Sequence, residues 1–296
     1  SVMNILIAGG TGFIGKFLKK RFEESGFSVR VVSRNGTDVS WNEGELILEL
    51  EKTDVLINLS GKSINSRFTK KNKEAILQSR IETTNLLNKA ISLCKTPPKL
   101  WINASATGIY NHTGVNKTMN ESSMDFAGDF LGNVVQQWEK AFFSTFIPNV
   151  RKVAIRTSVV LGNSGGAFPL FKLLAVTGLG GKQGNGRQMV SWIHVEDYYR
   201  IVLFLIQNTG ISGTVNAAVP YPVSNQIFMK TLREVKRMPL GIPAPAWLLK
   251  IATFIVGVDA SLILGSTNVN SETLKINGFE FQFPTIDKAF RDLTQL

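Results

Sequence analysis

Cysteine and histidine are scarce in this chain of 296 residues, which contains one cysteine, Cys94, and two histidines. A single cysteine cannot form an internal disulfide bond, and this is compatible with a reducing cytoplasm. Zinc sites need several His, Cys or carboxylate ligands at characteristic spacings, and no such cluster occurs in the sequence. We therefore expect a cytoplasmic protein without a metal site.

Long apolar runs are also absent. The apolar stretch at residues 247–258 is interrupted by Lys250 and is too short to span a bilayer, so we expect a buried helix there. No secretory signal pattern precedes the first predicted strand. The composition, 44% hydrophobic and 19% charged residues, is typical of a globular protein with no membrane segment.

Acidic residues are fewer than basic ones, and the formal net charge is +11. The basic clusters at residues 16–21 and 67–73 fall on predicted helices, whose solvent faces need charge. No helix-turn-helix, zinc-finger or aromatic RNA-binding motif accompanies them, so we expect no nucleic-acid partner. A basic field instead favours anionic cofactors and substrates.

The most informative motif is the glycine-rich run at residues 9–15, with the sequence GGTGFIG. It follows an apolar strand at residues 3–8 and precedes a predicted helix at 13–25. Glycine allows the chain to turn sharply, to approach a pyrophosphate and to pack the helix against the strand. Gly9, Gly12 and Gly15 have a different spacing from the G-x-G-x-x-G of many dehydrogenases. The run predicts a dinucleotide site with the phosphates at the helix N-terminus.

The end of the second strand indicates which dinucleotide binds. The strand at residues 28–32 is followed by Ser33 and Arg34, where an NAD site would carry Asp or Glu for the ribose hydroxyls. An arginine there suits the 2′-phosphate of NADP. The alternative interpretation is a solvated surface arginine.

Strand and helix patterns alternate through the first half of the chain, which predicts a Rossmann-like, doubly wound parallel sheet of the α/β class. Ligands of such sheets bind beyond the carboxyl ends of the strands. The expected strands are 3–8, 28–32, 54–59, 100–104 and 152–156, and the expected long helices are 13–25, 69–93 and 126–146.

The composition of the sequence changes near residue 163, where glycine-rich segments that indicate loops and hairpins begin. We predict an NADP-binding domain at residues 1–163 plus about 191–218, and a smaller substrate-side lobe at about 164–190 and 219–296. The border between the lobes is defined least well, because residues 191–218 are expected to rejoin the nucleotide sheet.

These motifs together resemble the extended and atypical short-chain dehydrogenase/reductases. The closest resemblance is to epimerase-family proteins that are often labelled NAD-dependent epimerases or cell-division inhibitors, and it includes that family's small C-terminal domain. The resemblance is carried by residues 9–15, 33–34, Trp41, 58–61, 79–80, 104–110, 138–139, 159–162, 165–166, 191–194 and 245–293.

The resemblance implies a cofactor site around the glycine turn. In it Ser33 and Arg34 hold the adenosine phosphate, and Arg80 and Val160 lie against the cofactor. For Arg80 the alternative is a helix-surface arginine paired with Glu74 or Glu82. The complete set of expected cofactor residues is Gly9, Thr11, Gly12, Phe13, Ile14, Gly15, Ser33, Arg34, Leu59, Ser60, Gly61, Arg80, Ala104 and Val160.

The residues for proton transfer are missing. Working members of the superfamily use a tyrosine and a lysine one helical turn later. The corresponding positions here are Leu131 and Val135, and no Tyr-x-x-x-Lys occurs in the chain. Relatives acting on nucleotide sugars also carry an arginine where this chain has Val190; Arg187 lies three residues earlier.

Three other residues are candidates for acid or base chemistry. Ser105 and Tyr110 follow a predicted strand end, and His194 could titrate near neutral pH or be a structural histidine at the mouth of a helix. We expect an NADP-dependent oxidoreductase or epimerase acting on a small substrate. The alternative is a non-catalytic NADP-binding protein that regulates or binds a protein partner.

Overall fold

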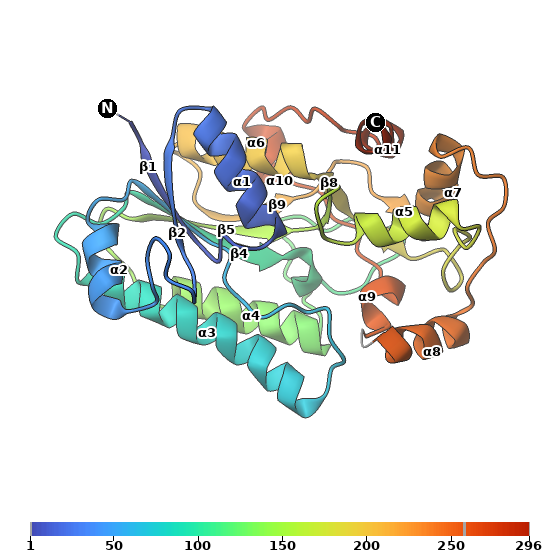
Figure 1. The fold of residues 1–296 in the computed structure, drawn as a ribbon, viewed down its shortest axis with the longest axis horizontal. Helices are drawn as coiled ribbons and strands as arrows, with labels where there is room; N and C mark the ends of the chain where they lie inside the picture. Colours follow the sequence, from blue (N-terminus) through green and yellow to red (C-terminus); the bar gives the residue numbers. More distant parts are fainter. Residues whose placement is uncertain (1, 257–258, 296) are drawn as a thin grey trace.

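A six-stranded parallel sheet forms the centre of the molecule (Figure 1). The computed structural model describes residues 2–256 and 259–295. The strand order is β2-β1-β3-β4-β5-β9, so the predicted doubly wound α/β fold is confirmed. The strands are β1 (Asn4–Ala8), β2 (Ser28–Val32), β3 (Val55–Asn58), β4 (Leu100–Ala106), β5 (Arg151–Thr157) and β9 (Gly213–Ala217).

Helices cover both faces of this sheet, because successive side chains of a strand point to opposite faces. Ile5 and Ile7 of β1 join the core beneath α1 (Phe13–Glu24) and α6 (Val195–Gln207). Leu6 and Ala8 join the other core, which contains side chains of α2, α3 and α4. Figure 1 shows the two helical layers on either side of the sheet. The helices of the second layer are α2 (Glu43–Leu50), α3 (Lys70–Ser92) and α4 (Phe130–Phe143).

The helix predicted at residues 126–146 is shorter in the structure, and its predicted start is wrong. Asp129 caps α4, since its carboxylate accepts a hydrogen bond from the Gly132 amide at 2.9 Å. Phe126, before the cap, instead forms a β-bridge with Tyr110. This bridge ties the segment after the short 3-10 helix Thr107–Ile109 to the entry of α4.

A smaller group of helices with its own core lies beside the sheet domain. Phe168, Phe228 and Phe290 pack together at its centre. The proposed lobe boundaries stay a prediction, and Leu274 of α10 (Glu272–Ile276) packs in the sheet core beside α1 and α6. The other elements are β6 (Val159–Leu161) paired with β8 (Trp192–His194), β7 (Met189–Val190) paired with β10 (Val223–Ser224), α5 (Phe168–Val176), α7 (Asn225–Val235), α8 (Ala246–Val256), α9 (Ser261–Leu264) and α11 (Ile286–Thr294).

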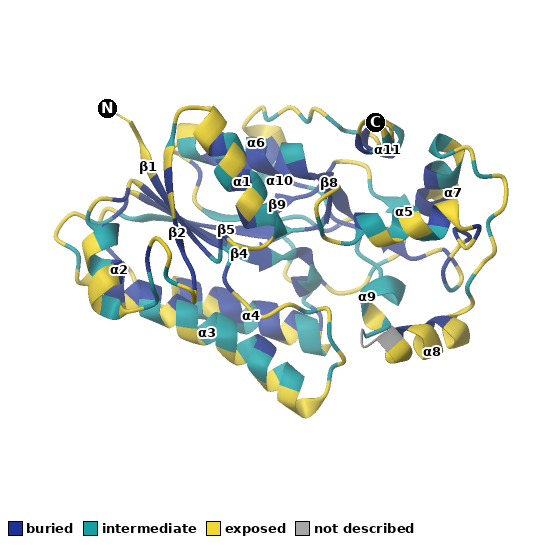
Figure 2. Ribbon diagram, viewed as in Figure 1, coloured by how far each residue is buried: buried dark blue, intermediate teal, exposed yellow. Residues whose placement is uncertain are grey.

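Helix α8 corresponds to the apolar stretch at 247–258, and the prediction that this helix is buried is wrong. Trp247 is 65% exposed and Ile255 is 72% exposed, whereas Leu249 and Thr253 are buried. Figure 2 shows the exposed face of α8 at the edge of the molecule. Residues 257–258 of the stretch lie outside the described residues. No helix in the described part of the chain has the length and apolar character needed to cross a membrane.

Candidate functional site

The glycine turn lies at the point where the strand order reverses, between β1 and β3. In doubly wound sheets this switch point opens a crevice beyond the carboxyl ends of the strands. Gly9 has φ of +74°, and a Cβ atom there would lie 2.8 Å from Ser60 Cα. A Cβ on Gly15 would lie 2.5 Å from Gly10 Cα. Glycine is therefore required at both positions, by conformation and by close packing.

Gly12 differs from these two glycines because a Cβ atom there would meet nothing within 4 Å. Its backbone is extended (φ −80°, ψ 179°) and it precedes the first residue of α1, with no side-chain cap on the helix. The first amides of α1 are thus left for another acceptor. This open helix N-terminus has the form of an anion site.

Phe13, in the glycine turn, packs against a glycine-rich segment that follows β6. A Cβ on Gly162 would lie 2.5 Å from Phe13 Cζ, and one on Gly165 would lie 2.8 Å from Phe13 Cβ. In the sequence, Gly162 and Gly165 belong to segments that carry the family resemblance, and Gly165 is also a loop signal. Their packing on Phe13 depends on contacts between residues far apart in the chain, and no local pattern indicates it.

Polar groups meet where β3 ends beside the middle of β4. The Asn58 amide donates to Asn103 Oδ1 at 2.7 Å, and Asn58 Oδ1 accepts from the Ser60 amide at 3.0 Å. The hydroxyl of Ser60 is buried and has no hydrogen-bond partner among the described residues. A buried polar atom without a partner is unfavourable, and a bound ligand would supply the missing partner.

Ser33 and Arg34 follow β2, as predicted from the sequence. Ser33 is buried and its amide donates to the Val39 carbonyl at 3.1 Å. Arg34 is exposed, and among the described residues it makes no ion pair or side-chain hydrogen bond. Its guanidinium is therefore available to an anionic ligand at this corner of the sheet.

Arg80 of α3 is largely buried against Gly61 and the Trp138 ring, whose centroid lies 4.9 Å from its Cζ atom. Its Nη1 donates to the carbonyls of Lys62 at 2.9 Å and Ile76 at 3.0 Å. Burial lowers the pKa of Arg80 to about 10. The alternative of a surface ion pair with Glu74 or Glu82 is wrong.

The remaining expected cofactor residues lie in the glycine turn, in α1 and in or directly after β3, β4 and β6. The Leu59 amide donates to the Ala8 carbonyl at 2.8 Å, which joins the ends of β3 and β1. Thr11 is exposed, Ile14 packs partly against the sheet core, Ala104 is half-buried in β4, and Val160 is buried in β6.

Ser105 and Tyr110 belong to a buried polar network. The Ser105 hydroxyl donates to Glu139, and Glu139 forms a bidentate ion pair with Arg156 at 2.8 and 2.9 Å. The Tyr110 hydroxyl accepts from Arg156 at 2.8 Å and donates to Asn216 at 2.9 Å. Burial raises the pKa of Tyr110, which is 1% exposed. Both hydroxyls are thus engaged by protein groups.

Glu139 lies in one of the segments that carry the family resemblance, whereas no motif in the sequence indicates a role for Arg156. Their pairing joins α4 to β5, and no sequence pattern indicates it. Glu121 has a similar structural role: its carboxylate accepts from the amides of Asn216 and Glu272, both at 2.9 Å. The Glu121 carboxylate thus connects β9 to α10.

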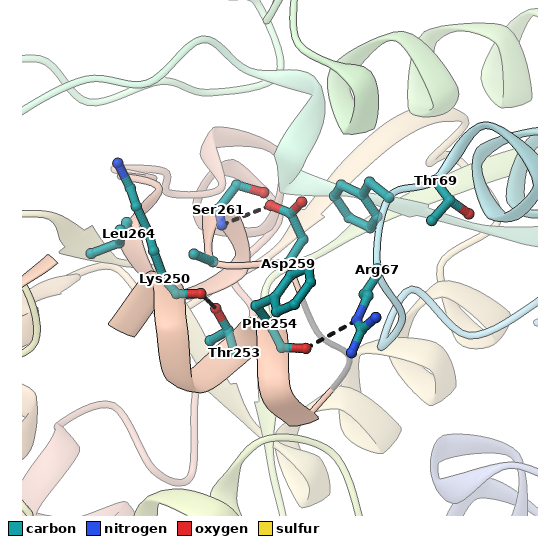
Figure 3. A pocket seen from close by; sticks show the side chains of 10 residues that line it. Arg67, Thr69, Lys250, Thr253, Phe254, Asp259, Ser261 and Leu264 are labelled. Carbon is teal, nitrogen blue, oxygen red and sulfur yellow. Dashed lines mark hydrogen bonds between the residues drawn. The ribbon is translucent and has the colours of Figure 1, made fainter. Parts of the chain in front are cut away.

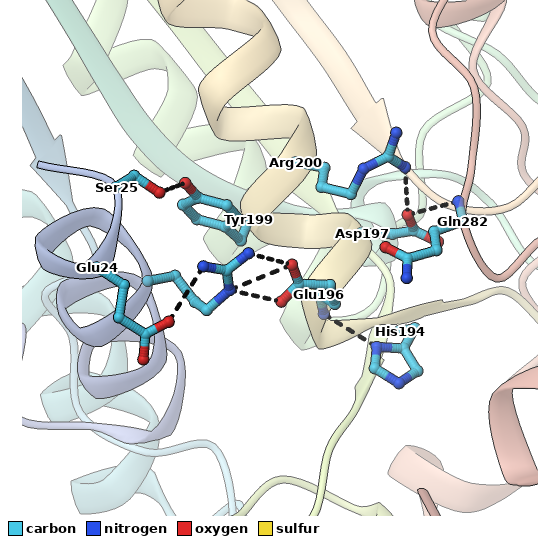
Figure 4. Close-up of polar contacts among 9 residues, drawn as sticks. Glu24, Ser25, His194, Glu196, Asp197, Tyr199, Arg200 and Gln282 are labelled. Carbon is cyan, nitrogen blue, oxygen red and sulfur yellow. Dashed lines mark hydrogen bonds and ion pairs between the residues drawn. The ribbon is translucent and has the colours of Figure 1, made fainter. Parts of the chain in front are cut away.

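His194 caps α6, and its Nδ1 accepts a hydrogen bond from the Glu196 amide at 3.0 Å (Figure 4). Its Nε2 lies 2.8 Å from an Asp292 carboxylate oxygen, and the ring stacks on Phe283. The accepting Nδ1 assigns the proton of the neutral ring to Nε2. These contacts favour the structural alternative for this histidine.

Asp197, in the first turn of α6, fastens the C-terminal segment to the helix. Its carboxylate accepts from the amides of Gln282 at 2.8 Å and Phe283 at 2.9 Å and pairs with Arg200. Arg21 of α1 forms a bidentate pair with Glu196, at 2.6 and 2.9 Å. This pair joins the last turn of α1 to the first turn of α6.

The positions at which the resemblance predicts acid, base or phosphate-binding groups hold apolar residues in this chain. Leu131 is half-buried, Val135 is buried, and neither can transfer a proton. Val190, in β7, pairs with Val223, and Arg187 is exposed in the preceding loop. Within the described part of the chain, no group of three His, Cys, Asp or Glu side chains could hold a metal ion.

An open glycine turn at the switch point of a doubly wound sheet defines a dinucleotide-binding class of α/β protein. The model of the NAD dependent epimerase/dehydratase family matches residues 5–125, and a domain of unknown function, DUF1731, matches residues 244–293. Epimerase family protein YfhF of Bacillus subtilis is 38% identical over 98% of this chain and 98% of its own length. The chain belongs to the epimerase family, which confirms the resemblance found in the sequence.

Solved structures agree with this family. The human epimerase family protein SDR39U1, crystallised with NADPH, is 30% identical, with a TM-score of 0.90 over 98% of this chain and 99% of that one. UDP-glucose 4-epimerase from Thermotoga maritima, solved with UDP-glucose, is 16% identical with a TM-score of 0.77 over 98% of this chain and 97% of that one. At this identity the second comparison shows the fold alone.

Proposed function

We propose that this protein binds NADP(H) in the crevice at the glycine turn. The observation that carries the proposal is the packing of Gly9 on Ser60 beside an open Gly12, with the Ser60 hydroxyl buried and unpartnered in the described structure. The pyrophosphate would lie at the N-terminus of α1, and Arg34 would hold the 2′-phosphate. The NADPH bound to the human relative supports this choice.

Replacing Arg34 by alanine is expected to weaken NADPH binding about tenfold to a hundredfold. A charge-assisted contact contributes about 1.5 to 3 kcal/mol, and about 1.4 kcal/mol corresponds to a factor of ten. NADH affinity should change little, because NADH has no 2′-phosphate. Calorimetric titrations of both cofactors with the variant measure this, and Arg30→Ala, which removes an exposed arginine of β2, is a control. Equal losses for NADPH and NADH would contradict the role of Arg34.

The reaction that fits this site best is oxidation or reduction of a small substrate, in which NADP(H) supplies hydride transfer. The protein would contribute positioning and electrostatics. Epimerisation through transient oxidation belongs to the same chemistry. The test is NADPH oxidation, and NADP reduction, by the pure protein across a panel of small metabolites. Turnover that needs NADPH and disappears with a glycine-turn variant supports the proposal; no turnover with any compound would count against it.

The second candidate is a non-catalytic NADP-binding protein, in which cofactor occupancy stabilises a surface for a protein partner. It is favoured by the buried contacts of Ser105, Tyr110 and His194, which engage all three proposed acid or base groups. A ligand present at a hundred times its Kd stabilises the folded state by about 2.7 kcal/mol.

Once a substrate has been identified, the Tyr110→Phe variant distinguishes the catalytic function from the non-catalytic one. Loss of the hydroxyl leaves Arg156 and Asn216 short of a hydrogen-bond partner, so we expect stability to fall by about 1–3 kcal/mol. If the hydroxyl is structural, turnover per folded molecule should stay within about twofold. A loss of turnover of at least a hundredfold in folded protein would identify Tyr110 as a proton donor.

A further inference from the structure

A cavity of about 610 Å³ lies outside the glycine turn, between residues 67–69, α8 and α9 (Figure 3). This volume lies within the range of small-molecule sites, about 300–1,000 Å³. Its walls combine basic and apolar side chains. The residues that matter for its chemistry are Arg67, Phe68, Lys250, Phe254, Asp259 and Leu264.

Arg67 is held in a defined orientation in this cavity. Its Nε donates to the Phe254 carbonyl at 3.0 Å, and its Cζ lies 4.3 Å from the centroid of the Phe254 ring. The two terminal nitrogens form no hydrogen bond to any residue that the structure describes. A guanidinium fixed through Nε and stacked on a ring presents the rest of its planar fork to a ligand.

The charges and the apolar surface of the cavity indicate the type of ligand. The lining residues include two cations, Arg67 and Lys250, and one carboxylate, Asp259, and that carboxylate already accepts from the Ser261 amide at 2.9 Å. Phe254 is 64% exposed although it lines the cavity. An organic anion with an apolar body would satisfy the cations and cover the phenyl rings.

One wall of the cavity lies close in sequence to the cofactor residues at the end of β3. Arg67 follows Ser60 by seven positions, so the two residues lie within about 25 Å of each other. Phe68 packs edge-on against Phe130 at 5.0 Å between ring centroids. Phe130 begins α4, the helix whose first two turns carry Leu131 and Val135.

We propose that this cavity binds a carboxylate with an apolar body, with Arg67 holding the carboxylate and the rings of Phe68 and Phe254 packing on the apolar part. The planar, two-oxygen carboxylate matches the planar guanidinium fork. That the bound carboxylate is the substrate rests on the proposed function; the binding itself does not.

Calorimetric titration of the NADP-saturated protein tests this inference, with octanoate as the probe and octanamide as its uncharged counterpart. We expect octanoate to bind at least tenfold more tightly than octanamide. Arg67→Gln should weaken octanoate binding about tenfold to a hundredfold and leave NADPH affinity unchanged. Arg187→Gln, which removes an exposed arginine that does not line the cavity, is the matched control and should bind octanoate like the parent protein.

Several outcomes would overturn the inference: no octanoate binding, equal binding of octanoate and octanamide, or an Arg67→Gln variant that binds like the parent. Octyl phosphate binding more than tenfold tighter than octanoate would overturn the choice of a carboxylate. The titration is repeated without cofactor to keep the two proposals separate. Octanoate binding in a protein that does not bind NADPH would refute the proposed function and leave the carboxylate site standing.

Discussion

Gly12→Ala is expected to raise the Kd for NADPH about a hundredfold while leaving the fold intact. The backbone at Gly12 has φ of −80°, which alanine adopts without strain, and a Cβ there meets no protein atom within 4 Å. The added methyl group would instead occupy the approach of the pyrophosphate to the α1 amides. Losing two charge-assisted hydrogen bonds of about 1.5 kcal/mol each accounts for this factor.

Two further glycine variants serve as controls. Calorimetry measures their NADPH affinity, and thermal unfolding measures their Tm. Gly9→Ala should lower the Tm as well as NADPH affinity, because its Cβ would lie 2.8 Å from the Ser60 backbone. Gly114→Ala, in an open loop position, should change neither. If Gly12→Ala binds NADPH as the parent does, the pyrophosphate does not lie at this turn.

The second large effect concerns the ion pair between Glu139 and Arg156. Their side chains are only 11% and 6% exposed. Glu139→Ala leaves the Arg156 guanidinium buried without its counter-charge, so the free energy of unfolding should fall by about 3–5 kcal/mol. Urea denaturation followed by circular dichroism measures this change.

The matched control is Glu82→Ala, an exposed glutamate of α3, which should change the free energy of unfolding by no more than about 0.5 kcal/mol. The double variant Glu139→Leu, Arg156→Met should recover much of the lost stability, because it removes the orphaned charge as well. A Glu139→Ala protein as stable as its parent would show that the pair does not hold α4 to β5.

The parallel sheet could be predicted because its strands are short, apolar and separated by helical patterns. Glycine positions were equally informative, since Gly9 and Gly15 have conformational and packing requirements that other residues cannot meet. The apolar sequence of helix α8 predicts a buried helix. Such a sequence does not reveal whether another part of the chain covers the helix. In the structure Trp247 and Ile255 are exposed.

The interior of the site could not be predicted in the same way. Tyr110 and Asn216 are 106 residues apart and meet only because β5 lies between β4 and β9. The two roles considered for His194 differ only in tertiary contacts, such as the one with Asp292. Such contacts depend on the topology of the whole chain, and a local pattern of residue types does not contain them.

The most direct test of the account is a calorimetric titration of the unmodified protein with NADPH and with NADH. Arg34 beyond β2, with no acidic residue in its place, predicts that NADPH binds about ten to a hundred times more tightly than NADH. Equal affinities, or no binding of either cofactor, would contradict the claim that this crevice is an NADP(H) site.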